Sequence, residues 1–221
     1  SAGNSSLPSA ERRIVIDTQA PDRPTAPALT AASDSGVVND GLTKDATPAF
    51  YGSAESDVAV TLVVDGSIRA QGAASAAGGY GLTSDPLGHG EHSVAVGATD
   101  LAGNSSPLSR RASVLIDLRA PFVRQLSISP EAFVPGPRAL TRIRFRVPEA
   151  ATVNVKIERK GFVHRFPAVS TQGAKTLKFV WHGRTAHAKL APAGFYRIVI
   201  VTVDRAGNRA VSRDRRVRVN R

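Results

Sequence analysis

The stretch GEHSVAVGATDLAGN (90–104) predicts the fold of the whole chain. Its first half alternates inward and outward side chains, which is typical of a β-strand, and D-x-A-G-N then marks a hairpin turn. GFYRIVIVTVDRAGN (194–208) aligns with it without a gap, 104 positions later, and AGNSS occurs at both 2–6 and 102–106. A period near 100 residues with the same turn chemistry indicates tandem modules.

The repeat divides the 221 residues into a first module, residues 18–117, and a second module, residues 118–221. Residues 1–17 match the end of the first module, so we expect them to be the final strand of a preceding, truncated repeat. Each linker ends in Ala-Pro, at Pro21 and Pro121, and proline keeps the residue before it extended. The chain has no Met and opens inside a repeat motif, so we expect it to be a piece of a longer protein.

Short strands with period-2 alternation, separated by Gly, Pro, Asp and Asn clusters, run through both modules, and no segment shows a helical period. About seven antiparallel strands per module suit a β-sandwich, so the sequence predicts an all-β chain of two tandem Ig-like sandwiches. We expect strands at 27–33, 47–53, 58–65, 67–75, 79–84, 91–99 and 110–117, then at 123–129, 141–147, 152–159, 162–168, 175–182, 195–203 and 210–219.

The D-x-A-G-N motif has a local explanation in turn chemistry. Gly103 and Gly207 can adopt the positive φ that short hairpin loops require. Asp100 and Asp204 can accept hydrogen bonds from backbone N–H groups further along the turn. The simplest interpretation of the motif is therefore a hairpin connection.

Composition restricts the function further. The absence of cysteine excludes disulfides and thiolate metal sites, and no apolar run reaches the roughly 18 residues that a membrane span needs. The net charge of +11 is unevenly distributed: the first module has 5 Lys and Arg against 11 Asp and Glu, whereas the second has 22 against 5. The two modules are therefore opposite in charge, which bears on their partners.

Several segments of the first module resemble the bacterial Ig-like domains of large surface adhesins: DTQAP (17–21), TPAFYGSAE (47–55), VTLVVDG (60–66) and ATDLAGNSS (98–106). In the second module, FVWHGRTAHAKLAPAGFY (179–196) resembles the Ig-like domain of flagellar hook-capping proteins, a domain that also recurs at the C-termini of secreted bacterial enzymes. Such relatives often carry acidic residues after the Trp. This chain has His182, Thr185 and His187 there, so we expect no acidic metal loop.

The resemblance implies an extracellular or cell-surface, architectural role without catalysis. The residues agree, because the chain lacks the motifs of hydrolase nucleophiles, P-loops, zinc proteases and dinucleotide sites. We therefore expect a non-catalytic stalk or spacer and interaction module whose first partners are neighbouring Ig-like modules. One alternative is an accessory C-terminal region of a secreted polysaccharide-active enzyme, and another is flagellar hook capping. The sequence flanking residue 1 would distinguish the stalk from the accessory region of an enzyme, because further repeats of about 100 residues favour the stalk and a catalytic domain favours the enzyme.

A basic surface is the first candidate site. In the strand 141–147 three arginines alternate with apolar residues and therefore share the solvent face. The strand 175–182 belongs to the same sheet of an Ig-type sandwich, so its outward residues should join them. This surface either keeps the protein soluble or contacts a polyanion, such as an anionic polysaccharide, a cell-wall phosphate polymer or an acidic neighbouring module. Nucleic acid would match the charge, but no recognition fold accompanies it. The predicted residues are Arg142, Arg144, Arg146, Lys178 and His182.

Calcium at the module junctions is the second candidate. Sandwich geometry brings the linker, one interstrand loop and the D-x-A-G-N turn of the next module to one end. Converging oxygen ligands without Cys or His suit calcium, and no other cofactor is expected. The competing interpretation is that the aspartates only cap turns. The predicted ligands are Asp17, Glu55, Asp57, Asp100 and Asn104 at one junction, and Asp117, Glu149, Asp204 and Asn208 at the other.

Two weaker patterns remain. Trp181, Phe195 and Tyr196 could form a sugar-stacking platform. Strand alternation favours the core instead, because Trp181 shares a face with Leu177 and Tyr196 shares one with Ile198. His182 and His187 are five positions apart, whereas a zinc site needs three or four converging ligands.

Overall fold

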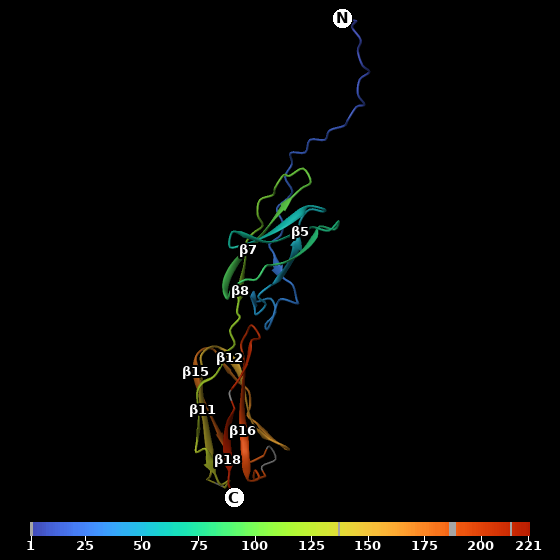
Figure 1. Cartoon of the computed structure of the whole chain (residues 1–221). Helices are drawn as coiled ribbons and strands as arrows, with labels where there is room; N and C mark the ends of the chain where they lie inside the picture. Colours follow the sequence, from blue (N-terminus) through green and yellow to red (C-terminus); the bar gives the residue numbers. More distant parts are fainter. Residues whose placement is uncertain (1, 137, 186–188, 213) are drawn as a thin grey trace. The chain divides into compact units, whose positions relative to one another are not determined.

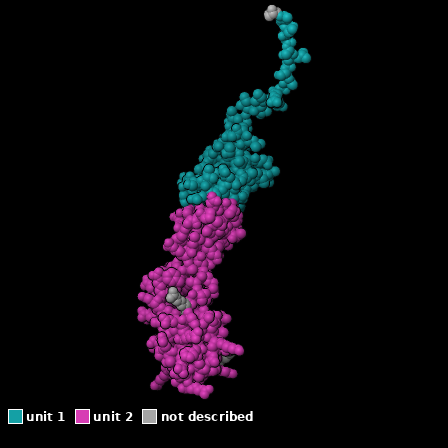
Figure 2. Space-filling model, viewed as in Figure 1, with its two compact units in different colours: residues 1–27, 51–82, 94–112 teal, residues 28–50, 83–93, 113–221 magenta. Residues whose placement is uncertain are grey.

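The computed structural model describes residues 2–136, 138–185, 189–212 and 214–221. These residues form strands and no helix (Figure 1), which confirms the predicted all-β class. The chain divides into two compact units (Figure 2). Unit 1 comprises residues 1–27, 51–82 and 94–112, and unit 2 comprises residues 28–50, 83–93 and 113–221. The predicted module boundaries at 17/18 and 117/118 stay a prediction.

The first eight strands lie in the first module and form two sheets with the orders β1-β3-β6 and β2-β8-β7-β4-β5. Their bounds are β1 Ala28–Leu29, β2 Leu42–Thr43, β3 Ala49–Ser53, β4 Ala59–Val64, β5 Ser67–Ala73, β6 Gly79–Thr83, β7 Gly90–Thr99 and β8 Ala112–Ile116.

Alternation along these strands gives each sheet one buried face. In β4 the side chains of Val60, Leu62 and Val64 are buried, while the residues between them are partly exposed. In β6 Tyr80 and Leu82 are buried in the same way. Such a pattern is what a sheet with one core-facing side requires.

The second module also has two sheets: β15-β11-β9, and β10-β18-β16-β12-β13 with β14 beside β12 and β17 beside β16. The bounds are β9 Arg124–Ser129, β10 Ala132–Phe133, β11 Thr141–Val147, β12 Ala151–Arg159, β13 Phe162–Arg165, β14 Val169–Thr171, β15 Lys175–Trp181, β16 Gly194–Val203, β17 Arg209–Val211 and β18 Arg215–Val219.

One hydrophobic cluster joins these two sheets, as a sandwich requires. It contains Phe145 and Trp181 from the three-stranded sheet and Ile157 and Tyr196 from the larger sheet. The rings of Trp181 and Tyr196 have centroids 5.2 Å apart, and Phe133 meets Trp181 edge-on at 5.7 Å. The sandwich predicted for this module is therefore confirmed.

Most predicted strands agree with the structure to within a few residues, and the differences have local causes. The strand expected at 27–33 ends at Leu29, because Ser33 and Asp34 both donate backbone hydrogen bonds to the carbonyl of Thr30 and turn the chain. The strand expected at 210–219 divides into β17 and β18. Two short pairs, β2 with β8 and β10 with β18, are parallel rather than antiparallel.

Residues 2–20 form no strand, and their side chains are exposed. The apolar residues Leu7, Ile14 and Ile16 are 91%, 82% and 84% exposed. The role of this segment as the last strand of a preceding repeat stays a prediction.

Candidate functional site

The three arginines of β11 lie on the solvent face of the sheet, as predicted. Arg142, Arg144 and Arg146 are exposed, and the intervening Ile143 and Phe145 are fully buried. This alternation follows from the pleat of the strand, which directs successive side chains to opposite faces. We call the outward surface of β15, β11 and β9 the basic face.

Lys178 joins the arginines from the neighbouring strand. Its Cα is paired with that of Arg144 in the register between β11 and β15. Val180, 42% exposed, is paired with Arg142 in the same way. Paired residues on adjacent strands lie on the same face, so Lys178 extends the positive charge sideways from the arginine column.

The other neighbour, β9, contributes residues that sequence reasoning missed. Ser127 and Ser129 are paired with Arg144 and Arg142, and Arg124 is paired with Arg146. The register shifts between the pairs of Arg144 and Arg146, and Gln125 adopts a φ of 54° there. This bulge places Arg124 where simple alternation would place Gln125, so period-2 counting could not have found it.

A depression on the basic face has a volume of about 360 Å³. Its rim carries cationic and hydroxyl groups, and Val180 and Phe179 contribute apolar surface. Such a hollow can hold an anionic group with some apolar surface. The polar lining residues are Ser127, Ser129, Arg142, Arg144 and Lys178.

The basic face lacks internal neutralisation. β9, β11 and β15 contain no Asp or Glu. Among the described residues, the ion pairs involve none of the three arginines of β11 and not Lys178. Like charges therefore oppose one another across strands, which is unfavourable for the sheet alone.

His182 lies one residue beyond β15 and is exposed. One ring nitrogen, Nδ1, is 3.3 Å from the carbonyl oxygen of Ala139. It does not line the depression of the basic face. His187, the other half of the weak zinc pattern, lies outside the described residues.

The three aromatic residues considered for sugar stacking lie in different environments. Trp181 is 1% exposed, with its indole Nε1 donating to the carbonyl of Arg184 at 2.9 Å, and Tyr196 is fully buried. These two are core residues, as the alternation indicated. Phe195 is 60% exposed and lies 5.5 Å from the guanidinium carbon of Arg218. The three residues therefore do not form a shared platform.

At the second junction the D-x-A-G-N turn holds the linker by a hydrogen bond. The amide Nδ2 of Asn208 donates to the backbone carbonyl of Asp117 at 2.8 Å and to Oδ2 of Asp204 at 3.0 Å. The backbone N–H of Asn208 donates to Oδ1 of Asp204 at 2.8 Å. Asp204 thus orients the asparagine that binds the linker.

The first turn repeats this arrangement within unit 1. Asn104 donates from Nδ2 to the carbonyl of Asp17 at 3.2 Å and to Oδ2 of Asp100 at 2.8 Å. The hydrogen bond from Asn104 lowers the pKa of Asp100, although partial burial opposes the shift. The amide Nδ2 of each asparagine is thus used within the protein, and the two carboxylate oxygens of Asp100 accept hydrogen bonds from Asn104.

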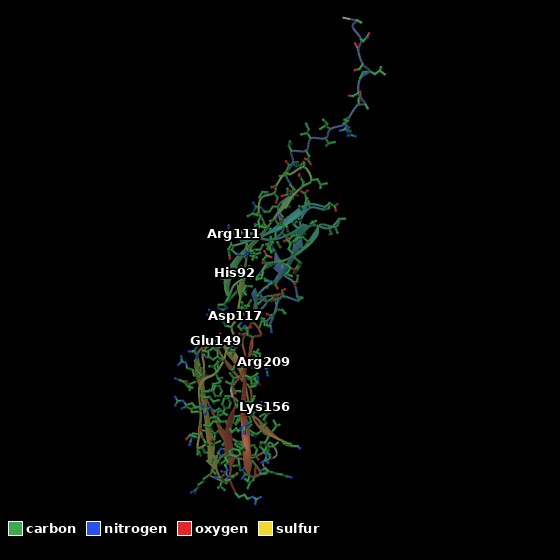
Figure 3. All side chains as sticks on the ribbon, in the orientation of Figure 1. His92, Arg111, Asp117, Glu149, Lys156 and Arg209 are labelled. Carbon is green, nitrogen blue, oxygen red and sulfur yellow. The ribbon has the colours of Figure 1, made fainter. Side chains whose placement is uncertain are left out.

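Carboxylates also gather near the second linker (Figure 3). Burial raises the pKa of Glu149, and the negative charges of Asp117 and Asp204 raise it further. Oδ1 of Asp117 lies 3.4 Å from Nδ1 of His89 and accepts the N–H of Arg119 at 3.0 Å. A cation near Glu149 would reduce the repulsion between these carboxylates. Oδ1 of Asp117, however, already interacts with His89 and with the N–H of Arg119.

The remaining predicted calcium ligands, Glu55 and Asp57, lie in unit 1. Oε1 of Glu55 accepts the N–H of Asp22 at 2.5 Å. Asp57 has a φ of 60° and forms part of the turn before β4. In the described part of the chain, no three His, Cys, Asp or Glu side chains are grouped so as to hold a metal ion. Calcium at the junctions stays a prediction, and the geometry favours turn capping.

Comparison with known families identifies the first module. Residues 20–118 match the model of the bacterial Ig-like domain. This part of the chain is similar to a bacterial Ig-like domain. The fold of this Ig-like domain fits a structural module, and such domains are typically non-catalytic. The resemblance of the second module to hook-capping proteins stays a prediction.

Solved structures with similar folds share little sequence with this chain. Dimeric latent PorU from Porphyromonas gingivalis is 16% identical, with a TM-score of 0.35 over 90% of this chain and 20% of that chain. The fibronectin(III)-like modules of Clostridium thermocellum CbhA are 12% identical, with a TM-score of 0.44 over 87% and 92%. A tetra-tandem repeat from the extending region of a large adhesion protein is 18% identical, with a TM-score of 0.33 over 80% and 47%.

The chain thus spans about a fifth of the length of PorU. No curated protein matches the sequence significantly. In the part of the chain that the structure describes, no helix has the length and apolarity needed to cross a membrane.

Proposed function

We propose that this chain is a non-catalytic structural and interaction module of a secreted or surface-anchored bacterial protein, and that its second module binds linear anionic polymers through the basic face. The observation that carries the proposal is the column of Arg142, Arg144 and Arg146 on β11, with Lys178 beside it on β15. The three strands of this sheet contain no Asp or Glu. The Ig-like family of residues 20–118 supports the structural part of the proposal.

The spacing of the column suits a polymer better than a single small anion. Alternate residues on a strand are about 7 Å apart, so the three arginines present charges over roughly 14 Å. Each guanidinium offers a planar fork of N–H donors that fits carboxylate or phosphate groups. A chain with regularly repeated anionic groups can therefore contact several arginines at once.

Binding would also relieve a cost within the sheet. Arg144 faces Lys178 and Arg146 faces Arg124 across neighbouring strands. Like charges in such positions are destabilising, and an anionic ligand between them replaces repulsion by attraction. In the depression beside the arginines, Ser129 adds a hydroxyl group, whereas the hydroxyl of Ser127 already donates to the carbonyl of Arg144 at 3.4 Å.

The test is a binding measurement on the whole chain with two probes, polyphosphate and polyglutamate, and with neutral dextran as a third. If four cations of the basic face are neutralised, the logarithm of the binding constant should fall with the logarithm of salt concentration with a slope of about −3. Dextran should not bind. A preference for polyphosphate or polyglutamate would identify the anionic group.

A matched pair of triple variants separates the basic face from net charge. Replacing Arg142, Arg144 and Arg146 by Gln should weaken binding at least tenfold. Replacing Arg197, Arg209 and Arg218, which are exposed on the other sheet, removes the same charge and should have a smaller effect. Equal losses in the two triples would show that binding follows net charge, and the proposed basic face would be wrong.

A further inference from the structure

Within unit 2, a loop of the first module lies against the D-x-A-G-N turn of the second. The N–H of Val37 donates to the carbonyl of Arg205 at 3.2 Å, and the hydroxyl of Ser35 donates to the carbonyl of Ala206 at 2.7 Å. Nζ of Lys44 donates to the carbonyl of Gly207 at 2.9 Å. The loop, together with Lys44 just after β2, therefore binds three successive carbonyls of the turn.

Backbone shape alone fixes part of this contact. Gly36 has a φ of +79°, and a Cβ atom at this position would lie 1.9 Å from the carbonyl oxygen of Arg205. Only glycine allows so close an approach in this conformation. The loop around Gly36 is thus shaped to the backbone of a D-x-A-G-N turn.

One side-chain pair adds selectivity. The guanidinium of Arg205 lies 2.9 Å from Oδ2 of Asp40, which comes from the same loop. Asp40 is only 13% exposed, so an unpaired carboxylate there would be partly desolvated. Arg205 occupies the x position of D-x-A-G-N, the one position inside the motif at which the two turns of the chain differ.

The first module carries the same turn with a different residue at x. The backbone N–H of Asp100 donates to the carbonyl of Asn104, as that of Asp204 does to the carbonyl of Asn208, at 3.1 Å in both turns. Position x is Leu101, which is 99% exposed. The next residue, Ala102, is also exposed, whereas its counterpart in the second turn, Ala206, is completely buried.

We propose that the turn at residues 100–104 is a docking site for the corresponding loop of another Ig-like module, and that the x residue selects the loop. Arg205 selects a loop with an acidic side chain at the position of Asp40. Leu101 selects a loop with an apolar side chain there, because a carboxylate against leucine loses water without gaining a partner. Burying the exposed leucine adds to the contact. The inference does not depend on polyanion binding by the basic face.

The chemistry of the x position can be tested in the chain as it stands. Arg205→Leu converts the second turn into the D-L-A-G-N of the first. The amide of Val37 reports docking, because its N–H donates to the carbonyl of residue 205. Arg205→Leu should speed hydrogen exchange at Val37 about two- to fivefold, the range expected for a partly exposed ion pair. Adding Asp40→Leu should slow it again.

Asp40→Leu in the presence of Arg205 is the control, since it also removes the hydrogen bond from the N–H of Leu42 to Asp40. With Arg205 present, Asp40→Leu should speed hydrogen exchange at the Val37 amide. If Asp40→Leu speeds exchange equally with Arg205 and with leucine at 205, the x residue does not select the loop and the inference fails.

Leu101 itself is tested in a three-module chain, in which a copy of residues 18–117 replaces residues 1–17 and alone carries the isotope label. When the added copy carries Asp40→Leu, its Val37 amide should exchange slowly if the following module has Leu101. When the copy keeps Asp40, its Val37 amide should exchange slowly only if the following module carries Leu101→Arg. Equal protection in matched and mismatched pairs, or protection in none, would overturn the proposal.

Discussion

Asn208 donates its side-chain amide to the backbone carbonyl of Asp117, 91 positions away in sequence, at a distance of 2.8 Å. The turn and the linker before the same module are therefore joined directly. Asp204 supports this contact by accepting both the backbone and the side-chain N–H of Asn208. The repeated D-x-A-G-N motif is thus a device that closes a hairpin and also fastens a linker.

Replacing Asn208 by Ala should lower the free energy of unfolding by about 1 kcal/mol, because a partly buried carbonyl and a carboxylate each lose a donor. Chemical denaturation followed by tryptophan fluorescence measures the loss in the second module. Asn104→Ala, followed by circular dichroism, is the matched control. It removes the same contacts inside its turn, but its linker partner, Asp17, belongs to an exposed segment without strands. Equal losses would show that the linker bond contributes nothing.

Trp181 should be the most sensitive core position of the second module. It is 1% exposed and packs against the rings of Phe133, Phe162 and Tyr196. Trp181→Ala should cost about 3–5 kcal/mol, the range for large-to-small changes in a core. Phe195→Ala, at a 60% exposed position of the same module, should change stability by no more than about 0.5 kcal/mol. Thermal unfolding by circular dichroism compares the two, and similar losses would contradict this assignment of the core.

His164 should make the stability of the second module depend on pH. Burial lowers its pKa from 6.5, and its Nδ1 has no hydrogen-bond partner among the described residues. The unfolded chain therefore binds this proton at a higher pH than the folded chain does. The contribution of neutral His164 to the free energy of unfolding is therefore fully present above about pH 6.5. It is lost as the pH drops through the lower pKa of the folded state.

His164→Gln should remove this part of the pH dependence, measured as the urea midpoint from tryptophan fluorescence between pH 5 and 7.5. The other four histidines remain in both proteins, so the difference between the two curves isolates His164. Parallel curves would mean that His164 titrates equally in the folded and unfolded chains.

Arg144→Glu should separate stability from binding. A glutamate at this position faces Lys178 across the sheet, so a repulsive pair becomes attractive and the module should gain about 0.2–1 kcal/mol. Polyphosphate binding should weaken at the same time, because the centre of the arginine column is reversed in charge. Arg144→Gln, which removes the charge without reversing it, should lie between the two proteins in both measurements. A variant that is less stable and binds equally well would contradict both the register and the proposed function.

The sequence by itself determined most of the strands and the faces of the sheets. In β11, for example, alternation placed Arg142, Arg144 and Arg146 outward and Phe145 inward, and the structure agrees. Trp181 and Tyr196 were assigned to the core on the same grounds. Such predictions succeed because the period-2 pleat is a local property, and side chains that share a face must share its solvent exposure.

The tertiary structure decided which residues from distant segments meet. A bulge at Gln125 brought Arg124 opposite Arg146, although simple alternation would have placed Gln125 there. The loop containing Asp40 meets Arg205, and Asn208 turns its amide nitrogen toward the carbonyl of Asp117. The sequence shows which groups are available, but their partners depend on loop paths and side-chain orientations. These are fixed only when the whole chain has satisfied its backbone hydrogen bonds and buried its apolar faces.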